Sequence, residues 1–206
     1  MHEVPRLFSI EGRRALVTGG TVGIGRMIAA AYVRAGADVM IVSRKPEDLE
    51  RAVAELSADG TCRSITADLS TREGCAHVAD RYSDHASSLD ILVNNAGIIH
   101  PRINLVDFDF DLWRKVIAVN LEAAALLTKH CLPSMIENGY GKIINISSIG
   151  GRKGSKGRSA YRVTKAALIS LTESVAAEVK QYGIDVNCIC PGGVDTEGYR
   201  EAFETG

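Results

Sequence analysis

Tyr161 and Lys165 are the pair of side chains whose types and spacing best suit chemistry. They stand four residues apart in the pattern Y-x-x-x-K, and residues at that spacing share one face of a helix. A free tyrosine has a pKa of about 10, too high for a base near neutrality, but a neighbouring ammonium group favours the phenolate. The pair therefore predicts a general acid/base. Because this spacing is also common on solvent-facing helices, the surrounding sequence has to support the interpretation.

A glycine-rich turn, T-G-G-T-V-G-I-G over residues 18–25, directly follows the first predicted strand and precedes a helical segment. Glycines let the backbone turn tightly and approach a pyrophosphate, whose charge is stabilised by the exposed N–H groups and positive dipole end of the helix. The order of strand, turn and helix favours a dinucleotide site over an ordinary turn. The expected contacts are Gly19, Thr21, Val22, Gly23, Ile24 and Gly25.

The end of the second predicted strand bears on which dinucleotide is bound. A site that prefers NAD places an acidic residue there for the ribose hydroxyls, whereas this sequence has Ser43, Arg44 and Lys45. An arginine can pair with a 2′-phosphate through two charge-assisted hydrogen bonds. The residues therefore favour NADP(H) over NAD(H). The alternative is that both cations merely begin a solvated helix before Pro46.

Short β-branched runs alternate with helical segments along nearly the whole chain, which predicts one Rossmann-type, doubly wound parallel sheet with helices on both faces. The strand runs are nearly continuous in apolar residues, as a sheet buried on both faces requires. The expected strands are 15–18, 38–43, 62–67, 91–94, 142–147 and 185–190. The expected helices are 25–35, 46–56, 71–82, 111–138 with a break near Pro133, and 159–182.

These motifs, taken in order, resemble the short-chain dehydrogenase/reductase family, and in particular its 3-oxoacyl-(acyl-carrier-protein) reductase-like members. The glycine turn has the family's spacing G-x-x-x-G-x-G, preceded by Thr18. Residues 94–97 read N-N-A-G after the fourth predicted strand. Ser148 stands thirteen positions before Tyr161, as in the family's pattern. The matches extend from the first strand to about Thr196.

The resemblance implies a role for each matching residue. Tyr161 would protonate the substrate oxygen during reduction, Ser148 would hydrogen-bond that oxygen, and Lys165 would hold the nicotinamide ribose. Asn120 would support a water-mediated proton relay. The remaining cofactor contacts implied are Asp68 and Leu69 at the adenine, Asn95, Ala96 and Gly97 at the ribose, and Pro191, Gly192, Val194 and Thr196 on the nicotinamide side.

Composition excludes several other classes of protein. Lys plus Arg number 24 and Asp plus Glu number 25 among 206 residues, so no basic footprint indicates a nucleic-acid partner. The start lacks a signal peptide and no apolar run approaches the roughly 20 residues that span a bilayer, which predicts a cytoplasmic protein away from membranes. The five cysteines and the scattered histidines have no metal-ligand spacing, so neither a metal site nor a disulfide framework is expected.

Two segments concern the substrate and the assembly. The stretch 150–158 carries four cations and no acid, which suggests an anionic or thioester-linked substrate, although a solvated loop is an equal alternative. Family members usually continue for some tens of residues beyond Thr196, through a substrate-covering helix and a last strand. We therefore expect 1–206 to form a single domain that lacks those parts. The resemblance also implies a homodimer or homotetramer built through the helices at 111–138 and 159–182.

The sequence thus predicts an NADP(H)-dependent oxidoreductase that interconverts a ketone and a secondary alcohol. A 3-oxoacyl-thioester or related carbonyl substrate is the leading expectation. A sugar-acid or polyol dehydrogenase of the same family is the nearest alternative. A non-catalytic, nucleotide-sensing Rossmann protein is a third, although Ser148, Tyr161 and Lys165 are all present.

Overall fold

A single six-stranded sheet organises the chain, and all of its strand pairs are parallel. The computed structural model describes residues 8–85, 88–197, 199 and 200. The strands are β1 (Arg14–Thr18), β2 (Asp38–Ser43), β3 (Cys62–Thr66), β4 (Ile91–Asn94), β5 (Gly141–Ile146) and β6 (Ile184–Ile189). Their order is β3-β2-β1-β4-β5-β6. The predicted doubly wound topology is confirmed, with strand ends within a residue or two of those expected.

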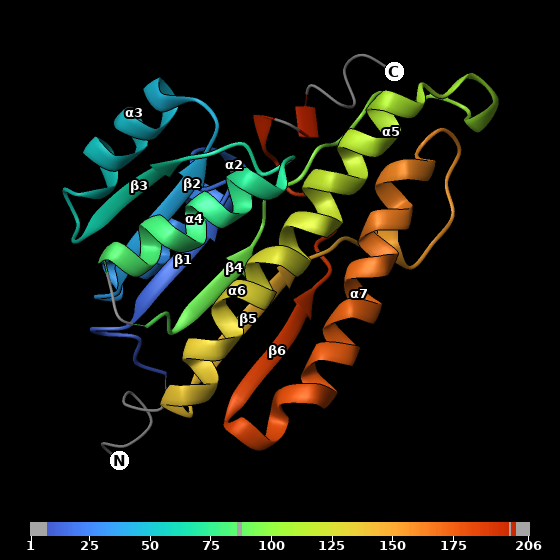
Figure 1. Ribbon diagram of the computed structural model, residues 1–206. Coiled ribbons are helices and arrows are strands. Elements are labelled where there is room, and N and C mark those ends of the chain that lie inside the picture. Colours follow the sequence, from blue (N-terminus) through green and yellow to red (C-terminus); the bar gives the residue numbers. More distant parts are fainter. Residues whose placement is uncertain (1–7, 86–87, 198, 201–206) are drawn as a thin grey trace.

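Helices cover the two faces of the sheet unequally (Figure 1). Helices α2 (Gly23–Arg34) and α3 (Pro46–Leu56) pack on one face and bury Val17 and Ile41. Helices α4 (Arg72–His85), α6 (Ala123–Asn138) and α7 (Ser159–Val179) pack on the other and bury Leu16 and Leu92. The shorter α5 (Phe110–Ile117) leads into α6. Because side chains alternate along each strand, both layers have an apolar strand face to cover.

The two edge strands differ from the prediction. The expectation that every strand run is nearly continuous in apolar residues and buried on both faces is wrong for β3 and β6. Arg63, Ser64 and Thr66 of β3 are exposed, and alternate residues of β6 are exposed from Asp185 to Ile189. An edge strand has a neighbour on only one side, and no described helix covers the outward face of β6. The alternation apolar-in, polar-out is the pattern of a half-buried strand.

The long helical segment 110–138 is irregular at a place the sequence did not indicate. A break was expected at Pro133, but α6 continues through that residue to Asn138, and Gly139 ends it in the left-handed region at φ 63°. Core contacts of Leu127, Cys131 and Met135 hold the helix across the lost backbone hydrogen bond. The irregularity is instead one π turn, η2 (Ala118–Glu122), centred on Asn120.

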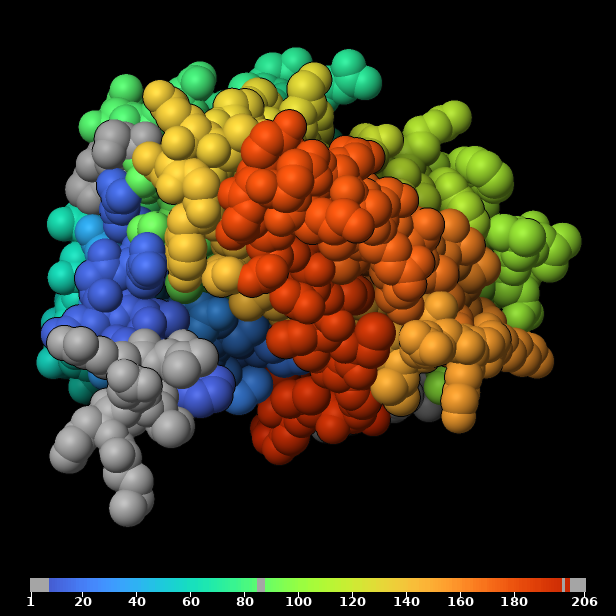
Figure 2. Space-filling view, turned by 90° about the horizontal axis from the view of Figure 1, so that it is seen from below, coloured from blue at the N-terminus to red at the C-terminus, as the bar shows by residue number. Residues whose placement is uncertain are grey.

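The edge of the sheet where the strands begin is held by polar contacts. In the view from below, residues 8–13, the end of α6 and the end of α7 lie at this edge (Figure 2). Asp90 pairs there with Arg13 (Nη1 to Oδ1, 3.2 Å) and accepts a hydrogen bond from the backbone N–H of Arg14 at 2.9 Å. The ends of the strands, at the opposite edge, are left for the candidate site.

Across the described residues, none of the helices is both long enough and apolar enough to span a membrane.

Candidate active site

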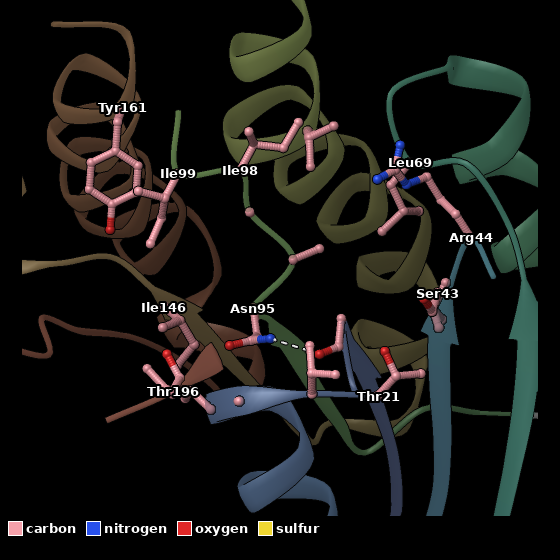
Figure 3. Close-up of a pocket in the computed structure, with 18 of the residues that line it drawn as sticks. Thr21, Ser43, Arg44, Leu69, Asn95, Ile98, Ile99, Ile146, Tyr161 and Thr196 are labelled. Atoms are coloured by element: carbon pink, nitrogen blue, oxygen red, sulfur yellow. Dashed lines mark hydrogen bonds between the residues drawn. The ribbon is translucent and has the colours of Figure 1, made fainter. Parts of the chain in front are cut away.

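A cleft of about 350 Å³ opens along the carboxyl ends of β1, β2, β3, β4 and β5. Tyr161 lies at one end, and Ser43, Arg44 and Leu69 lie at the other (Figure 3). Carboxyl ends of parallel strands are where open α/β sheets bind ligands. The predicted residues that line this cleft are Gly19, Thr21, Val22, Gly23, Ile24, Ser43, Arg44, Asp68, Leu69, Asn95, Ala96, Gly97, Tyr161, Lys165 and Thr196.

The glycine turn is held against the N-N-A-G segment by a set of short hydrogen bonds. The Thr18 hydroxyl accepts from the backbone N–H groups of Asn95 and Ala96, at 2.9 and 3.0 Å. The Asn95 side-chain amide donates to the carbonyls of Thr18 and Gly19, at 2.9 and 3.2 Å. Asn95 is thus a clamp on the turn as well as a residue of the cleft wall.

Two glycines of the turn are required by close packing. Gly19 has φ +65°, and a Cβ added there would lie 3.1 Å from Ala96 Cα. A Cβ on Gly25 would lie 2.2 Å from the carbonyl oxygen of Gly19. Side chains at these positions would push the turn off the strand ends, so the glycines keep the backbone open to the cleft.

The amino end of α2 has no capping partner from its own sequence. Its N-cap is Val22, which makes no side-chain hydrogen bond, and the first turn holds no acidic residue. By contrast, α5 is capped by the Asp109 carboxylate and α3 has Glu47 and Asp48 in its first turn. The first N–H groups of α2 therefore present an uncompensated positive end beside the cleft.

The far end of the cleft is set by the end of β2. Ser43 and Arg44 line it, whereas the next residue, Lys45, lies outside the lining; Arg44 and Lys45 are both exposed. Asp68 faces the same end, and its pKa is lowered, first by the backbone hydrogen bond from Ser70 and further by the charges of Arg44 and Lys115. Arg44 thus contributes a positive field where the cleft ends.

Lys165 lies beneath Tyr161 in the interior of the protein. Its side chain is 4 % exposed, and its Nζ donates to the Ile146 carbonyl at 2.7 Å and lies 5.7 Å from the centre of the Tyr161 ring. Burial lowers the pKa of the Lys165 ammonium to about 8. The Y-x-x-x-K pair therefore shares one side of α7 facing the cleft, as its spacing predicts.

Ser148 stands next to Tyr161, brought there by the end of β5. A Cβ built on Gly150 would lie 3.1 Å from Ser148 Oγ and 3.4 Å from Tyr161 Cε1, so both groups border one small space. The neighbouring Ser147 donates from its hydroxyl to the Lys165 carbonyl at 2.6 Å. This bond ties the strand end to α7 and fixes the two hydroxyls relative to each other.

Asn120 is buried behind the cleft wall and does not line it. Its Oδ1 accepts from the Ile98 N–H at 2.7 Å, and its Nδ2 donates to the Ile98 carbonyl and to Thr164 Oγ1, at 3.1 and 3.2 Å. A Cβ on Gly97 would lie 3.5 Å from both Asn120 Oδ1 and Lys165 Nζ. The side chain thus holds the segment after β4 against α7, close to Lys165.

A second pocket, of about 390 Å³, adjoins the cleft and shares Ile24, Ile99, Ser147, Tyr161 and Thr196 with it. The predicted residues that line only this second pocket are Ser148, Pro191, Gly192 and Val194. Because Tyr161 borders both spaces, a cofactor in the cleft and a substrate in the second pocket would meet at its hydroxyl. Of the predicted residues, only Gly25, Lys45 and Asn120 line neither.

His100 is a residue near this site that the sequence analysis set aside as surface or packing. Its ring is 1 % exposed, and Nδ1 donates to the Pro101 carbonyl at 2.6 Å. The other nitrogen, Nε2, accepts from the Tyr161 backbone N–H at 3.3 Å. Because one ring nitrogen donates and the other accepts, the ring is neutral. Burial lowers the His100 pKa and so favours the same neutral form. No signal local to His100 indicates this contact, because its partner is 61 residues away.

The residues of the cleft fit a dinucleotide and offer nothing for a metal. The glycine turn and the uncapped end of α2 suit a pyrophosphate, and Arg44 supplies a cation at the cleft end. Among the described residues, no group of three or more His, Cys, Asp or Glu side chains could hold a metal ion. The described cysteines are free, with Cys188 and Cys190 half-buried at the end of β6.

Comparison with known proteins decides the family. The model of the short chain dehydrogenase family matches residues 13–205. The chain belongs to this family. The curated proteins that it resembles include the cis-4-hydroxycyclohexanecarboxylate dehydrogenase of Sinomonas cyclohexanicum, which is 38 % identical over 186 residues, or 89 % of this chain and 74 % of the relative.

Solved structures share the fold of this chain, and they include complexes with NADP and with NAD⁺. The NADP complex of Pseudomonas aeruginosa RhlG has a TM-score of 0.88 and 36 % identity, covering 94 % of this chain and 77 % of that one. An NAD⁺-bound xylitol dehydrogenase has a TM-score of 0.84 and 31 % identity, covering 88 % and 70 %. This chain spans 62 % of the length of a short chain dehydrogenase of Pseudocercospora fijiensis and 74 % of the Sinomonas relative. It is an NAD(P)-dependent oxidoreductase.

Proposed function

We propose that this short-chain dehydrogenase uses NADP(H) to interconvert a ketone and a secondary alcohol, with Tyr161 as general acid/base. The observation that carries the proposal is the position of Tyr161 over the buried Lys165, on the wall shared by the cleft and the second pocket. The Lys165 ammonium favours the phenolate of Tyr161 at the place where a substrate oxygen would lie.

The other site residues have supporting roles in this proposal. When bound, the nicotinamide cofactor supplies or accepts the hydride. Ser148 donates its hydroxyl hydrogen to the substrate oxygen, and Tyr161 passes its proton to that oxygen in reduction or receives it in oxidation. Asn120 keeps the segment after β4 against α7, close to Lys165. Its expected part in a water-mediated proton relay remains a proposal.

The preference for NADP(H) rests on the end of β2. Arg44 lines the cleft end and can pair with a 2′-phosphate through two charge-assisted hydrogen bonds. An acidic residue, which would serve the ribose hydroxyls of NAD, is absent at positions 43–45. The NADP-bound relative supports the same preference, and the NAD⁺-bound relative makes a direct comparison of the two nucleotides necessary.

Fluorescence titration of the purified chain with NADPH and NADH tests the proposal. We expect NADPH to bind more tightly than NADH, and Arg44→Ala to weaken NADPH by about 10- to 100-fold while leaving NADH unchanged. Lys45→Ala tests the neighbouring cation, and Arg51→Ala on α3, outside the cleft, is the control. Equal affinity for the two nucleotides would contradict the preference, and binding of neither would contradict the function.

Two substrate classes are candidates for this enzyme. A 3-oxoacyl thioester or related carbonyl compound follows from the order of the motifs. A sugar-acid, hydroxy-acid or polyol substrate is the second candidate, favoured by the names of the xylitol and hydroxycyclohexanecarboxylate dehydrogenases among the relatives. Comparing reduction of an acetoacetyl thioester with reduction of a small keto acid separates the two.

A further inference from the structure

The second pocket combines an apolar wall with a cluster of cations. The wall is formed by Ile24, Ile99, Ile149, Pro191 and Val194, and the cations are Arg102, Lys153, Arg158 and Arg162. No Asp or Glu side chain stands among the described residues that line it. A pocket of this kind suits a small molecule that carries both an apolar body and a negative charge.

The fold assembles this cluster from three separate segments. Arg102 follows β4, Lys153 and Arg158 come from the segment between β5 and α7, and Arg162 belongs to α7. The Ile103 N–H donates to the Gly157 carbonyl at 3.0 Å, which joins the first two segments. Of the four cations in the basic run 150–158, Arg152 and Lys156 lie outside the lining. All four cations of the cluster therefore line the pocket, whereas only two of the four cations in the basic run do.

The cluster lies close to the reacting groups. Arg158 is the N-cap of α7, three residues before Tyr161, and residues three apart at a helix face lie about 5–6 Å apart at Cβ. Arg158 is also 5 % exposed, so water screens its charge little. Arg162 follows Tyr161 directly, and its Nε is buried with no hydrogen-bond acceptor among the described residues. A negative group bound here would lie within about one helical turn of Tyr161.

We propose that the substrate is a compact hydroxy or keto acid whose carboxylate is bound by Arg158, with Arg102, Lys153 and Arg162 adding to the positive field. The inference rests on the proposed function and deepens it by naming the substrate class. An extended pantetheine arm is much longer than one helical turn, so its phosphate would lie beyond this cluster while its thioester carbonyl faced Tyr161 and Ser148. The apolar wall holds the carbon frame between carboxylate and reacting carbon.

Matched pairs of ketones test this proposal, with NADPH oxidation followed by absorbance. One pair is 4-oxocyclohexanecarboxylate and its neutral methyl ester, and acetoacetyl-coenzyme A serves as the thioester arm. We expect the acid to exceed the ester in kcat/KM by about 10- to 100-fold, the effect of one charge-assisted pair. Arg158→Gln should remove most of this advantage, so that the acid-to-ester ratio of kcat/KM falls toward one.

Two further substitutions keep the test independent of whether Arg158→Gln folds. Arg102→Gln and Lys153→Gln, both at exposed positions, should each lower the acid-to-ester ratio by about threefold, with less effect at high salt because exposed charges are screened. Lys156→Gln, in the same loop but outside the pocket, should leave the ratio unchanged. These variants should retain NADPH affinity, because none of the three residues lines the cofactor cleft.

The outcomes separate the inference from the proposed function. Equal rates on acid and ester, or a higher rate on the thioester, would overturn the carboxylate site while leaving the oxidoreductase in place. A Lys156→Gln effect as large as that of Lys153→Gln would also overturn it, since only general charge would then matter. Binding of NADPH without turnover of any of the three ketones would contradict the proposed function itself.

Discussion

At the scale of single residues, the most unusual feature is an ammonium group inside the protein. Lys165 is 4 % exposed, and its Nζ donates a hydrogen bond to the Ile146 carbonyl. Burial disfavours the charged form and lowers the pKa to about 8. At neutral pH the folded chain therefore holds a buried charge that lowers its free energy of unfolding. This charge belongs to the residue that we propose activates Tyr161.

This cost predicts a pH dependence of stability. The folded pKa of about 8 lies below the unfolded value of about 10.4, so between these pH values the unfolded chain keeps a proton that the folded chain has released. The free energy of unfolding therefore rises with pH in this window. Relative to Lys165→Met, we expect the unmodified chain to gain about 2–3 kcal/mol from pH 8 to pH 10.4.

Urea unfolding of both proteins across this pH range, without cofactor, measures the difference directly. Lys129→Met is the control, because Lys129 is exposed on α6 and should show no such gain. Lys165→Met should also lose reductase activity at every pH. A stability difference that stays flat from pH 8 to pH 10.4 would mean that Lys165 does not carry a buried charge.

Contacts between residues close in the sequence could be predicted from it, and contacts between residues far apart in the sequence could not. Tyr161 and Lys165 were predicted as a pair because four positions on one helix fix their geometry. His100 was set aside because its contact with the Tyr161 N–H joins residues that only the fold brings together. Arg102 was missed for the same reason: its neighbour Ile103 meets Gly157, more than 50 positions later.

At the scale of elements, the π turn at Asn120 links two parts of the site. Such turns widen a helix locally and occur often at functional positions. Here the turn contains a buried amide that hydrogen-bonds Ile98 on one side and Thr164 on the other. The helix 110–138 therefore acts on the site from behind, by holding the segment after β4 against α7.

Replacing Asn120 with Asp tests this role of the turn. The carboxylate still accepts from the Ile98 N–H, but it cannot donate to the Ile98 carbonyl or to Thr164 Oγ1. We expect a loss of about 1–3 kcal/mol in stability and a fall in kcat/KM of about tenfold or more. Hydrogen exchange should show faster exchange of the Ile98 amide even though its own bond survives, because loss of the two donated bonds lets the segment after β4 open more often.

The matched control for this substitution is Asn138→Asp, at the exposed last position of α6. It should change neither kcat/KM nor the exchange of the Ile98 amide. Unchanged exchange in Asn120→Asp would show that the amide does not hold this segment. The sequence indicated the helix but placed its irregularity at Pro133, because a proline is visible in sequence whereas a π turn depends on how the helix packs.

At the scale of the whole molecule, the two faces of the sheet are covered to different extents. Helices α4, α6 and α7 reach across to β6, whereas the outward residues Asp185, Asn187 and Ile189 of β6 have no described helix over them. The alternating βα pattern predicted the topology correctly, since parallel crossovers leave few arrangements. It overestimated the burial of β3 and β6, because edge position is known only once the strand order is known.

The outer surface of α7 leads to a prediction about assembly. Ala166, Ser170, Ser174 and Ala177 are small, exposed and spaced at three or four positions along this helix. Small side chains allow the axis of a second helix to come close. Together with the family resemblance, this surface favours a homodimer or homotetramer that pairs α7 with its copy.

Light scattering after size-exclusion chromatography measures the assembly directly. We expect a mass of two or four times 22.1 kDa. Ser170→Arg should halve a tetramer or reduce a dimer to a single chain, because a long charged side chain would stand between the helices. Ser83→Arg, exposed on α4, is the control and should leave the mass unchanged. NADPH affinity should survive in both variants, since neither residue lines the cleft. A single-chain mass in the unmodified protein, or no effect of Ser170→Arg, would show that α7 does not form the interface.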